Sequence, residues 1–215
     1  MRLRNVKNAS EILKSRPDII ICNPENYKGK WKELFGNDQP IYLEIGMGKG
    51  QFIITNAQKF PDCNFIGLEL EASVLTKAIK KINEEIANLY IINYDATNIK
   101  NVFANNEIDK IFLNFSDPWP KNRHIKRRLT EKNFLDNYQD ILKNDCSIEF
   151  KTDNRKLFEF SLMEFIARGW KMEKLSLNLH EDDSEVITTE YEDRFTQEGK
   201  IIYFIEVQNG KNEII

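Results

Sequence analysis

The chain has 215 residues, of which 41% are hydrophobic and 30% are charged, and its formal net charge at pH 7 is −3. This length favours one full-sized domain over two, and the composition is typical of a soluble globular protein. No apolar run approaches the roughly 18 residues that a membrane helix needs. The first residues also lack the apolar stretch of a secretory signal, so we expect a cytoplasmic protein without a membrane partner.

The charge and the cysteines exclude further classes of protein. A net charge of −3 creates no global attraction for nucleic acid, so an anionic partner must be bound by a local basic patch. Cys22, Cys63 and Cys146 are odd in number and far apart, which argues against a disulfide framework and a zinc site. We expect each cysteine to be a small buried side chain, and we expect no bound metal.

In chain order, the first element is an irregular N-terminal lead-in over residues 1–40. It contains Pro17, Pro24 and Pro40, and one short helix is expected near residues 31–35. A single domain is expected over residues 41–215. Within it, short apolar runs predict strands at residues 41–45, 64–70, 89–93, 110–115 and 147–151.

Helices are expected between these strands. Apolar residues recur at helical spacing from Leu75 to Ile86 and again from Leu157 to Phe165. The strands are almost continuously apolar, as expected when helices cover both faces of a parallel sheet. We therefore predict a doubly wound α/β fold with a mostly parallel sheet, in which a last strand at residues 200–207 lies antiparallel to its neighbours.

A glycine-rich loop, EIGMGKG, follows the first strand from Glu44 to Gly50. A phosphate-binding P-loop requires Ser or Thr after the lysine, and here Lys49 is followed by Gly50, so that interpretation fails. The G-x-G-x-G spacing is also a poor match to the G-x-G-x-x-G of dinucleotide-binding proteins. A strand-terminal acid followed by G-x-G-x-G, with Gly46 and Gly48, resembles the first motif of S-adenosylmethionine (AdoMet) methyltransferases.

Two more carboxylates lie at the ends of the next strands. Glu69 is placed to accept hydrogen bonds from ribose hydroxyls, and Asp95 to meet an adenine amino group. Alone, either residue is more often a solvated charge or a helix cap. Acidic residues at three consecutive strand ends favour a nucleoside cofactor.

Residues 113–128, LNFSDPWPKNRHIKRR, end the fourth predicted strand. Pro118 and Pro120 cannot donate in a sheet, so Asp117 is expected at the carboxyl end of a strand, where open α/β sheets bind ligands. Trp119 and the basic residues that follow suit nucleic acid, through stacking and phosphate contact. Core packing of Trp119 and a solvated loop are the alternatives. Thr130 is expected to cap the next helix.

The segments NFSDPWPKNRHIKRRL, LEIGMGKGQF, FKTDNRKLFEFSL and TEYEDRF resemble the bacterial tRNA (guanine-N7)-methyltransferase family. The similarity extends over essentially the whole chain, including the lead-in segment NPENYKGKW. It implies a Rossmann-like AdoMet-dependent methyltransferase fold, with S-adenosylmethionine as cofactor and tRNA as partner. It also implies methyl transfer to N7 of the guanine at position 46, in the variable loop.

The resemblance assigns roles to residues that match the family's motifs. Asp117 is implied as the catalytic residue. The implied cofactor contacts, with the loop glycines included, are Glu44, Gly46, Gly48, Glu69, Asp95 and Asp117. The implied substrate contacts are Lys121, Asp153, Thr189, Glu190, Tyr191 and Glu192. The expected RNA-binding segment comprises Arg123, His124, Lys126, Arg127 and Arg128.

The chemistry of this reaction fits the chain. Guanine N7 carries a lone pair and no proton, so no general base is required, in keeping with a chain that has only two histidines. Carboxylates near the base, Asp117 or Asp153, would stabilise the positive charge that develops on guanine. One alternative is a noncatalytic RNA-binding protein on a methyltransferase scaffold. A nicotinamide dehydrogenase is a second alternative, which the glycine spacing disfavours. A monomer and a homodimer are both compatible with the sequence.

Overall fold

The computed structural model describes residues 6–82, 85–182 and 186–209. Their centre is a seven-stranded sheet with the order β3-β2-β1-β4-β5-β7-β6. The strands are β1 (Ile41–Ile45), β2 (Asn64–Glu69), β3 (Leu89–Asn93), β4 (Ile108–Asn114), β5 (Leu142–Thr152), β6 (Lys171–Ser176) and β7 (Tyr203–Gln208). Strands β1 to β5 pair in parallel, and β7 is antiparallel to both β5 and β6. The predicted doubly wound sheet with a last antiparallel strand is confirmed.

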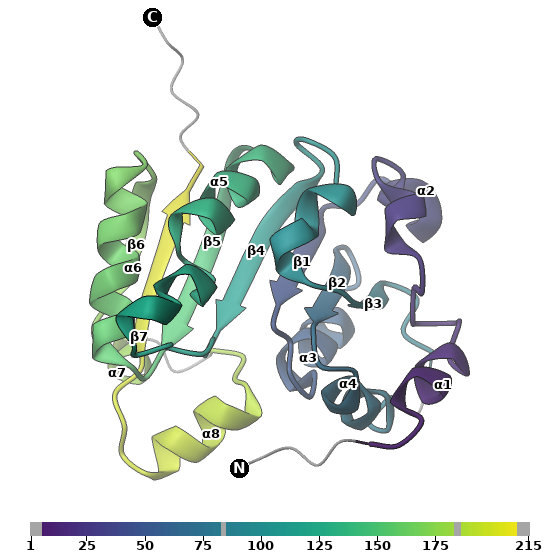
Figure 1. Ribbon diagram of the computed structural model, residues 1–215, viewed down its shortest axis with the longest axis horizontal. Helices are drawn as coiled ribbons and strands as arrows, with labels where there is room; N and C mark the ends of the chain where they lie inside the picture. Colours follow the sequence, from purple (N-terminus) through teal and green to yellow (C-terminus); the bar gives the residue numbers. More distant parts are fainter. Residues whose placement is uncertain (1–5, 83–84, 183–185, 210–215) are drawn as a thin grey trace, which may run out of the picture.

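Helices cover both faces of the sheet (Figure 1). They are α1 (Ala9–Lys14), α2 (Trp31–Phe35), α3 (Gln51–Lys59), α4 (Ala72–Ile79), α5 (Lys132–Ile141), α6 (Arg155–Ala167), α7 (Leu179–Asp182) and α8 (Glu190–Gln197). Short 3₁₀ segments are η1 (Pro24–Tyr27), η2 (Ala96–Asn101) and η3 (Asn122–Arg127). In Figure 1, α5 and α6 lie in front of the sheet and α3 and α4 behind it, while α8 lies below the carboxyl ends of β4 and β5.

Two hydrophobic clusters join these helices to the sheet. Leu135 and Tyr138 of α5 and Phe158 of α6 are buried in the cluster on one face. Ile53 of α3 and Leu75 of α4 belong to the cluster on the other. In each helix the apolar residues recur every three or four positions, so one side is buried and the other meets solvent.

The N-terminal lead-in packs against the body of the protein. Trp31 is fully buried, and its Nε1–H donates to the Val102 carbonyl at 3.0 Å. Ile20 forms a parallel bridge with Ile91, so the lead-in extends the edge of the sheet next to β3. The short helix predicted near residues 31–35 is present as α2.

The boundaries of some elements differ from the prediction. Helical spacing of apolar residues extends to Ile86, yet α4 ends at Ile79. The N–H groups of Lys81 and Ile82 bond three residues back, to Ala78 and Ile79, which tightens the chain into a turn. Ile82 is still buried in the same cluster, so its periodicity reflects burial without a helix.

Two further expectations are wrong. The Thr130 hydroxyl does not cap α5, because it is buried in a 2.6 Å hydrogen bond with Ser161, and the Glu131 side chain caps the helix at Asn133 N–H. Cys22 is exposed, and Cys63 and Cys146 are only partly buried. Cys22 follows the short bridge to β3, at the point where the lead-in leaves the sheet edge.

Candidate functional site

The glycine loop between β1 and α3 depends on backbone conformations that other residues adopt only with strain. Gly46, Gly48 and Gly50 have φ values of +78°, +57° and +80°. A Cβ on Gly50 would lie 2.8 Å from Cε of Met47 and 3.1 Å from Cδ1 of Ile54, so a side chain here would also displace its neighbours. The loop is tied to β2, since the N–H groups of Gly46 and Met47 both donate to the Leu68 carbonyl.

Glu69, at the end of β2, holds the same loop. Its carboxylate accepts from Gly48 N–H at 3.0 Å and from Glu71 N–H at 2.9 Å. Burial raises the pKa of Glu69, and these backbone hydrogen bonds oppose the shift. A carboxylate has about four acceptor positions, so Glu69 retains capacity to accept from a ribose hydroxyl.

Glu44 is buried where β1 meets the glycine loop. Asn114 of β4 donates to one of its oxygens at 2.9 Å. Burial raises the pKa of Glu44 to about 7, although Asn114 and the positive charge of Lys151 both lower it. The second oxygen of Glu44 and the amide oxygen of Asn114 are buried acceptors without a hydrogen-bond partner among the described residues.

Those two orphaned acceptors test whether the pocket fits the cofactor that the sequence implies. Buried acceptors without a donor cost free energy, so a ligand that brings a cationic donor would relieve them. The α-ammonium group of AdoMet is such a donor. The glycine loop and Glu69 lie at the same edge of the sheet, and the site fits this cofactor.

Asp95 follows β3 at this edge. It is exposed, and its Oδ1 accepts from Thr97 N–H at 2.9 Å, which caps η2. The helix-cap alternative therefore accounts for one of its oxygens. A capping carboxylate retains further acceptor positions that can meet an amino group.

The loop after β4 carries Asp117 in a strained turn. Phe115 and Trp119 have φ values of +50° and +40°, which non-glycine residues rarely adopt. Asp117 is exposed, and no hydrogen bond or ion pair with another described residue engages its carboxylate. The turn thus presents a free carboxylate next to the glycine loop, since β4 pairs directly with β1.

Arg128 stabilises this loop through hydrogen bonds to its backbone. Its guanidinium donates to the Pro118 carbonyl at 2.9 Å and to the Trp119 carbonyl at 3.2 Å, and it lies 4.4 Å from the Phe160 ring centre. A guanidinium engaged in this way has few donors left for a phosphate.

The basic segment itself forms η3. Arg123, Lys126 and Arg127 are exposed, as is Lys121 just before η3. The guanidinium of Arg127 lies 4.8 Å from the Trp119 ring centre, in a cation–π contact.

Trp119 is half-buried, and its ring meets that of His124 edge-on at 5.5 Å. His124 also accepts a hydrogen bond from Arg123 at 3.2 Å. The tryptophan is therefore neither a core residue nor a freely exposed ring, and it lies within the basic segment.

Helix α8 carries most of the remaining predicted substrate residues. Thr189 caps it, and the side chains of Thr189 and Glu192 form a reciprocal capping box. Tyr191 is 61% exposed, whereas Glu192 is fully buried. Glu190 pairs with Lys81.

Two further contacts place α8 over the carboxyl edge. Gln51, the first residue of α3, donates to Asp193 at 2.7 Å. The ring of Phe195 lies 6.4 Å from that of Phe115, at the end of β4. Asp153 lies on the following strand end and pairs with Lys200 at 3.3 Å.

The structure therefore gathers most of the predicted residues at one edge of the sheet, although Glu192 and Arg128 turn inward. Sequence reasoning missed three residues of this region: Asn114, Lys151 and Leu129. Leu129 would lie 3.9 Å from a Cβ on Gly46, so it packs over the glycine loop. A polar residue inside an apolar strand, as in LNF and FKT, is the signal that could have identified Asn114 and Lys151.

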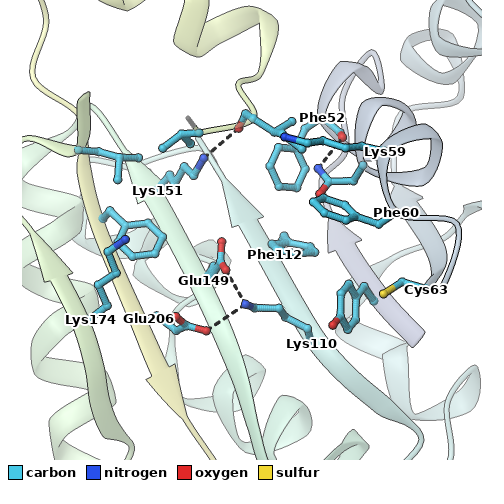
Figure 2. A pocket seen from close by; sticks show the side chains of 16 residues that line it. Phe52, Lys59, Phe60, Cys63, Lys110, Phe112, Glu149, Lys151, Lys174 and Glu206 are labelled. Atoms are coloured by element: carbon cyan, nitrogen blue, oxygen red, sulfur yellow. Dashed lines mark hydrogen bonds and ion pairs between the residues drawn. The ribbon is translucent and has the colours of Figure 1, made fainter. Parts of the chain in front are cut away.

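A separate cavity of about 410 Å³ opens over β4, β5 and β7, on the side of α3 (Figure 2). Lys110 pairs there with Glu149 at 2.5 Å and Glu206 at 3.0 Å. The glycine loop, Glu69 and Asp117 are not among its lining residues. The cavity is therefore distinct from the carboxyl-edge site.

In the part of the chain that the structure describes, no helix has both the length and the apolar character to cross a membrane. Nor do the described His, Cys, Asp and Glu residues form a group that could hold a metal ion.

A doubly wound sheet with β7 inserted antiparallel, and a ligand edge built from a glycine loop and strand-end carboxylates, defines a Rossmann-like methyltransferase. The family described as "Putative methyltransferase" matches residues 38–205. Two curated tRNA (guanine-N(7)-)-methyltransferases are similar along nearly their whole length. The protein from Streptococcus suis is 48% identical, with 97% of this chain and 99% of the relative covered. The protein from Bacillus cytotoxicus is 49% identical, with 97% of each covered. The chain belongs to the tRNA (guanine-N7)-methyltransferase family.

Solved structures support the fold at lower sequence identity. The 16S rRNA methyltransferase KamB superposes with a TM-score of 0.65 at 12% identity, covering 84% of this chain and 92% of that one. A SAM-dependent methyltransferase from Aquifex aeolicus gives a TM-score of 0.55 at 14% identity, covering 94% and 98%. At such identities the likeness concerns the fold alone.

Proposed function

We propose that this protein transfers the methyl group of AdoMet to N7 of a guanine in tRNA. The observation that carries the proposal is the carboxyl edge of β1 and β4, where the glycine loop and the orphaned acceptor of Glu44 adjoin the free carboxylate of Asp117. The exposed cations of η3 follow Asp117 directly in the chain. Membership of a family whose curated relatives carry this activity in their names supports the same conclusion.

The described residues divide the work in the following way. Glu44 receives the cofactor's ammonium group, Glu69 its ribose and Asp95 its adenine. When bound, the cofactor supplies an electrophilic methyl group on a sulfonium. Lys121, Lys126 and Arg127 contact tRNA phosphates, and Trp119 offers a ring edge to the RNA.

The chemical step requires orientation and charge stabilisation, without proton abstraction. The N7 lone pair forms the new bond to the methyl carbon while the carbon–sulfur bond breaks, so positive charge moves onto the guanine ring. Asp117 is better suited than Asp153 to stabilise this charge, because Asp153 is already paired with Lys200. Alignment of the reacting atoms can supply on the order of 7 to 11 kcal/mol.

The test is to incubate the protein with methyl-labelled AdoMet and unmodified tRNA and to identify the labelled nucleoside after digestion. We expect 7-methylguanosine, and the family resemblance implies position 46 of the variable loop. Label in another nucleoside would keep the cofactor and overturn the acceptor. If RNA and AdoMet both bind and no label is transferred, the noncatalytic RNA-binding alternative replaces this proposal.

A further inference from the structure

Lys151 is a buried cation that the proposed chemistry does not use. The residue is 2% exposed on β5, and its ammonium group donates to the Ile187 carbonyl at 3.1 Å. It also lies 5.3 Å from the ring centre of Phe52 in α3. Figure 2 shows it at the end of the open cavity, with its head turned toward the segment that leads into α8. A buried charge persists only where opposite charge and hydrogen bonds compensate it.

Glu192 of α8 provides the first compensating charge. One of its oxygens lies 3.6 Å from the Lys151 ammonium, and the other lies 3.2 Å from Nε2 of His180, without the alignment of a hydrogen bond. Burial lowers the pKa of Lys151 and raises that of Glu192, so each group depends on the other for its charge. Glu192 is 0% exposed, so its carboxylate faces the protein interior, toward Lys151 and His180.

After Glu192, the negative charges of Glu149 and then Glu44 raise the pKa of Lys151, and Glu44 is the one that belongs to the cofactor site. Asn114 is the register partner of Lys151 in the β4–β5 ladder, and it donates to Glu44 across to β1. The positive charge of Lys151 reaches Glu44 as well, where it lowers the pKa of that carboxyl. The charge of one ammonium group therefore acts both on Glu44 at the cofactor site and on Glu192 of α8.

The other polar contacts of α8 lie nearer the surface. Glu190 pairs with Lys81, whose side chain is 41% exposed, and the Gln51–Asp193 hydrogen bond is exposed to solvent. Exposed contacts of this kind contribute little to holding a helix in one place. The buried pair with Lys151 is thus the polar contact best suited to fix the first turn of α8.

We propose that Lys151 is a positioning residue, which holds α8 over the methyl acceptor through Glu192 and couples that helix to the cofactor pocket through Glu44. This inference rests on the proposed function. It gives Glu192 a role in fastening the helix, where the family resemblance implies a substrate contact. The side chain next to it, Tyr191, is then presented to the RNA in a fixed place.

The test compares Lys151→Met, which keeps an unbranched side chain against Phe52, with Lys110→Met. Lys110 is the matched control, because it lies on the same face of the sheet in a pair of ion pairs that do not involve α8. We expect Lys151→Met to lower kcat for tRNA methylation by about tenfold or more, with KM for tRNA changed by less than about threefold. Lys110→Met is expected to keep kcat within about twofold of wild type.

A second readout does not require activity. Hydrogen exchange of the α8 amides is expected to accelerate in Lys151→Met and to stay unchanged in Lys110→Met. If wild-type protein transfers no methyl group, the proposed function fails, and the exchange data still decide whether Lys151 holds α8. If Lys151→Met does not fold, Glu192→Gln is compared with Lys110→Met in its place, because it removes the negative charge of Glu192 at nearly constant side-chain volume.

The double variant Lys151→Met/Glu192→Gln distinguishes an effect on the position of α8 from a general loss of stability. It leaves neither Lys151 nor Glu192 charged without the other, so we expect its loss of stability to be smaller than the sum of the two single losses. Its kcat is expected to stay low, because no attraction then fixes α8. Recovery of kcat together with stability, or equal α8 exchange rates in Lys151→Met and Lys110→Met, would overturn the proposal.

Discussion

At the residue scale, the carboxylates of this site differ in what already contacts them. Glu69 accepts from two backbone amides, and Glu44 accepts from Asn114 with one oxygen and has no donor for the other. Asp117 is exposed and unengaged among the described residues. A carboxylate without a partner in the free protein can interact with a ligand without first breaking a hydrogen bond or an ion pair. Asp117 is therefore the strongest candidate for stabilising the positive charge on guanine.

We expect Asp117→Ala to lower kcat for tRNA methylation by about 100-fold and to leave the Kd for tRNA within about threefold of wild type. Steady-state kinetics and a binding titration measure the two quantities. Asp62→Ala removes an exposed carboxylate from the turn before β2, at the opposite edge of the sheet, and serves as the control. Equal losses in kcat and in tRNA affinity would reduce Asp117 to a binding role.

Glu44 makes stability depend on pH. Its pKa is about 7 in the folded protein against 4.5 in the unfolded chain, so its contribution to stability is full below pH 4.5 and is lost as pH rises through 7. In the cofactor-free protein we expect Glu44→Gln to remove roughly 2 to 3 kcal/mol of the fall in unfolding free energy between pH 5 and pH 8. Urea titrations of the variant and the wild type at pH 5 and pH 8 measure this difference in unfolding free energy. A variant with the same pH dependence as wild type would show that Glu44 titrates near its ordinary value.

At the element scale, the segment from Asp117 to Arg128 combines a strained turn with a basic 3₁₀ segment. Lys126 projects into solvent, while Arg128 bonds to two carbonyls of the turn. Adjacent basic residues in one run can therefore have different roles. The charge density of the run predicts that it binds an anion, and only the contacts of each side chain indicate which members do so.

Lys126→Ala is expected to weaken tRNA binding and to reduce the slope of log Kd against log salt concentration by about one. At saturating tRNA, kcat should be unchanged, because the turn that carries Asp117 is not touched. Lys171→Ala, which removes an exposed charge from β6 at the far edge of the sheet, is the control for net charge. An unaltered salt slope would contradict the assignment of Lys126 to a phosphate.

Arg128→Ala is expected to act differently. Loss of its bonds to Pro118 and Trp119 frees the strained turn, so kcat should fall by about tenfold or more while the salt slope stays close to wild type. The same kinetic and salt titrations measure both. A reduced slope with normal kcat would make Arg128 a phosphate contact, as the sequence alone suggests.

At the scale of the whole molecule, the lead-in and the sheet share one hydrophobic core. Trp31 is enclosed by Tyr27 and Phe103, with ring centres 5.9 and 5.5 Å away, and belongs to the same cluster as the residues beneath α5. The carboxyl edge is likewise assembled from segments far apart in sequence, since Gln51, Phe115 and Lys151 all contact α8 or the segment that leads into it. The site therefore depends on the integrity of the entire fold.

We expect Trp31→Ala to reduce the free energy of unfolding by about 3 to 5 kcal/mol, because it leaves a large cavity and an unpaired Val102 carbonyl. Urea unfolding followed by circular dichroism measures the loss. Trp119→Ala, at a half-buried position, should cost clearly less. If the two variants were equally stable, Trp31 would not anchor the lead-in to the core.

The sequence by itself determined the elements whose signals are local. Near-continuous apolar runs predicted the parallel strands, and glycines at the end of β1 predicted a loop with left-handed backbone. Prolines after Ser116 ended β4 where expected and placed Asp117 at the carboxyl edge. The antiparallel last strand was also predicted correctly, although the helix α8 (Glu190–Gln197) that precedes it has no apolar pattern and was not predicted.

Only the tertiary structure decided which partner each polar or apolar group has. Apolar periodicity continued past Ile79 although the helix did not, because periodicity reports burial and the same core buries a turn equally well. Glu192 and Lys151 are charged in sequence and buried in the fold, because each compensates the other across segments about 40 residues apart. A sequence pattern encodes what a side chain prefers, and the distance between two compensating groups exists only after the chain has folded.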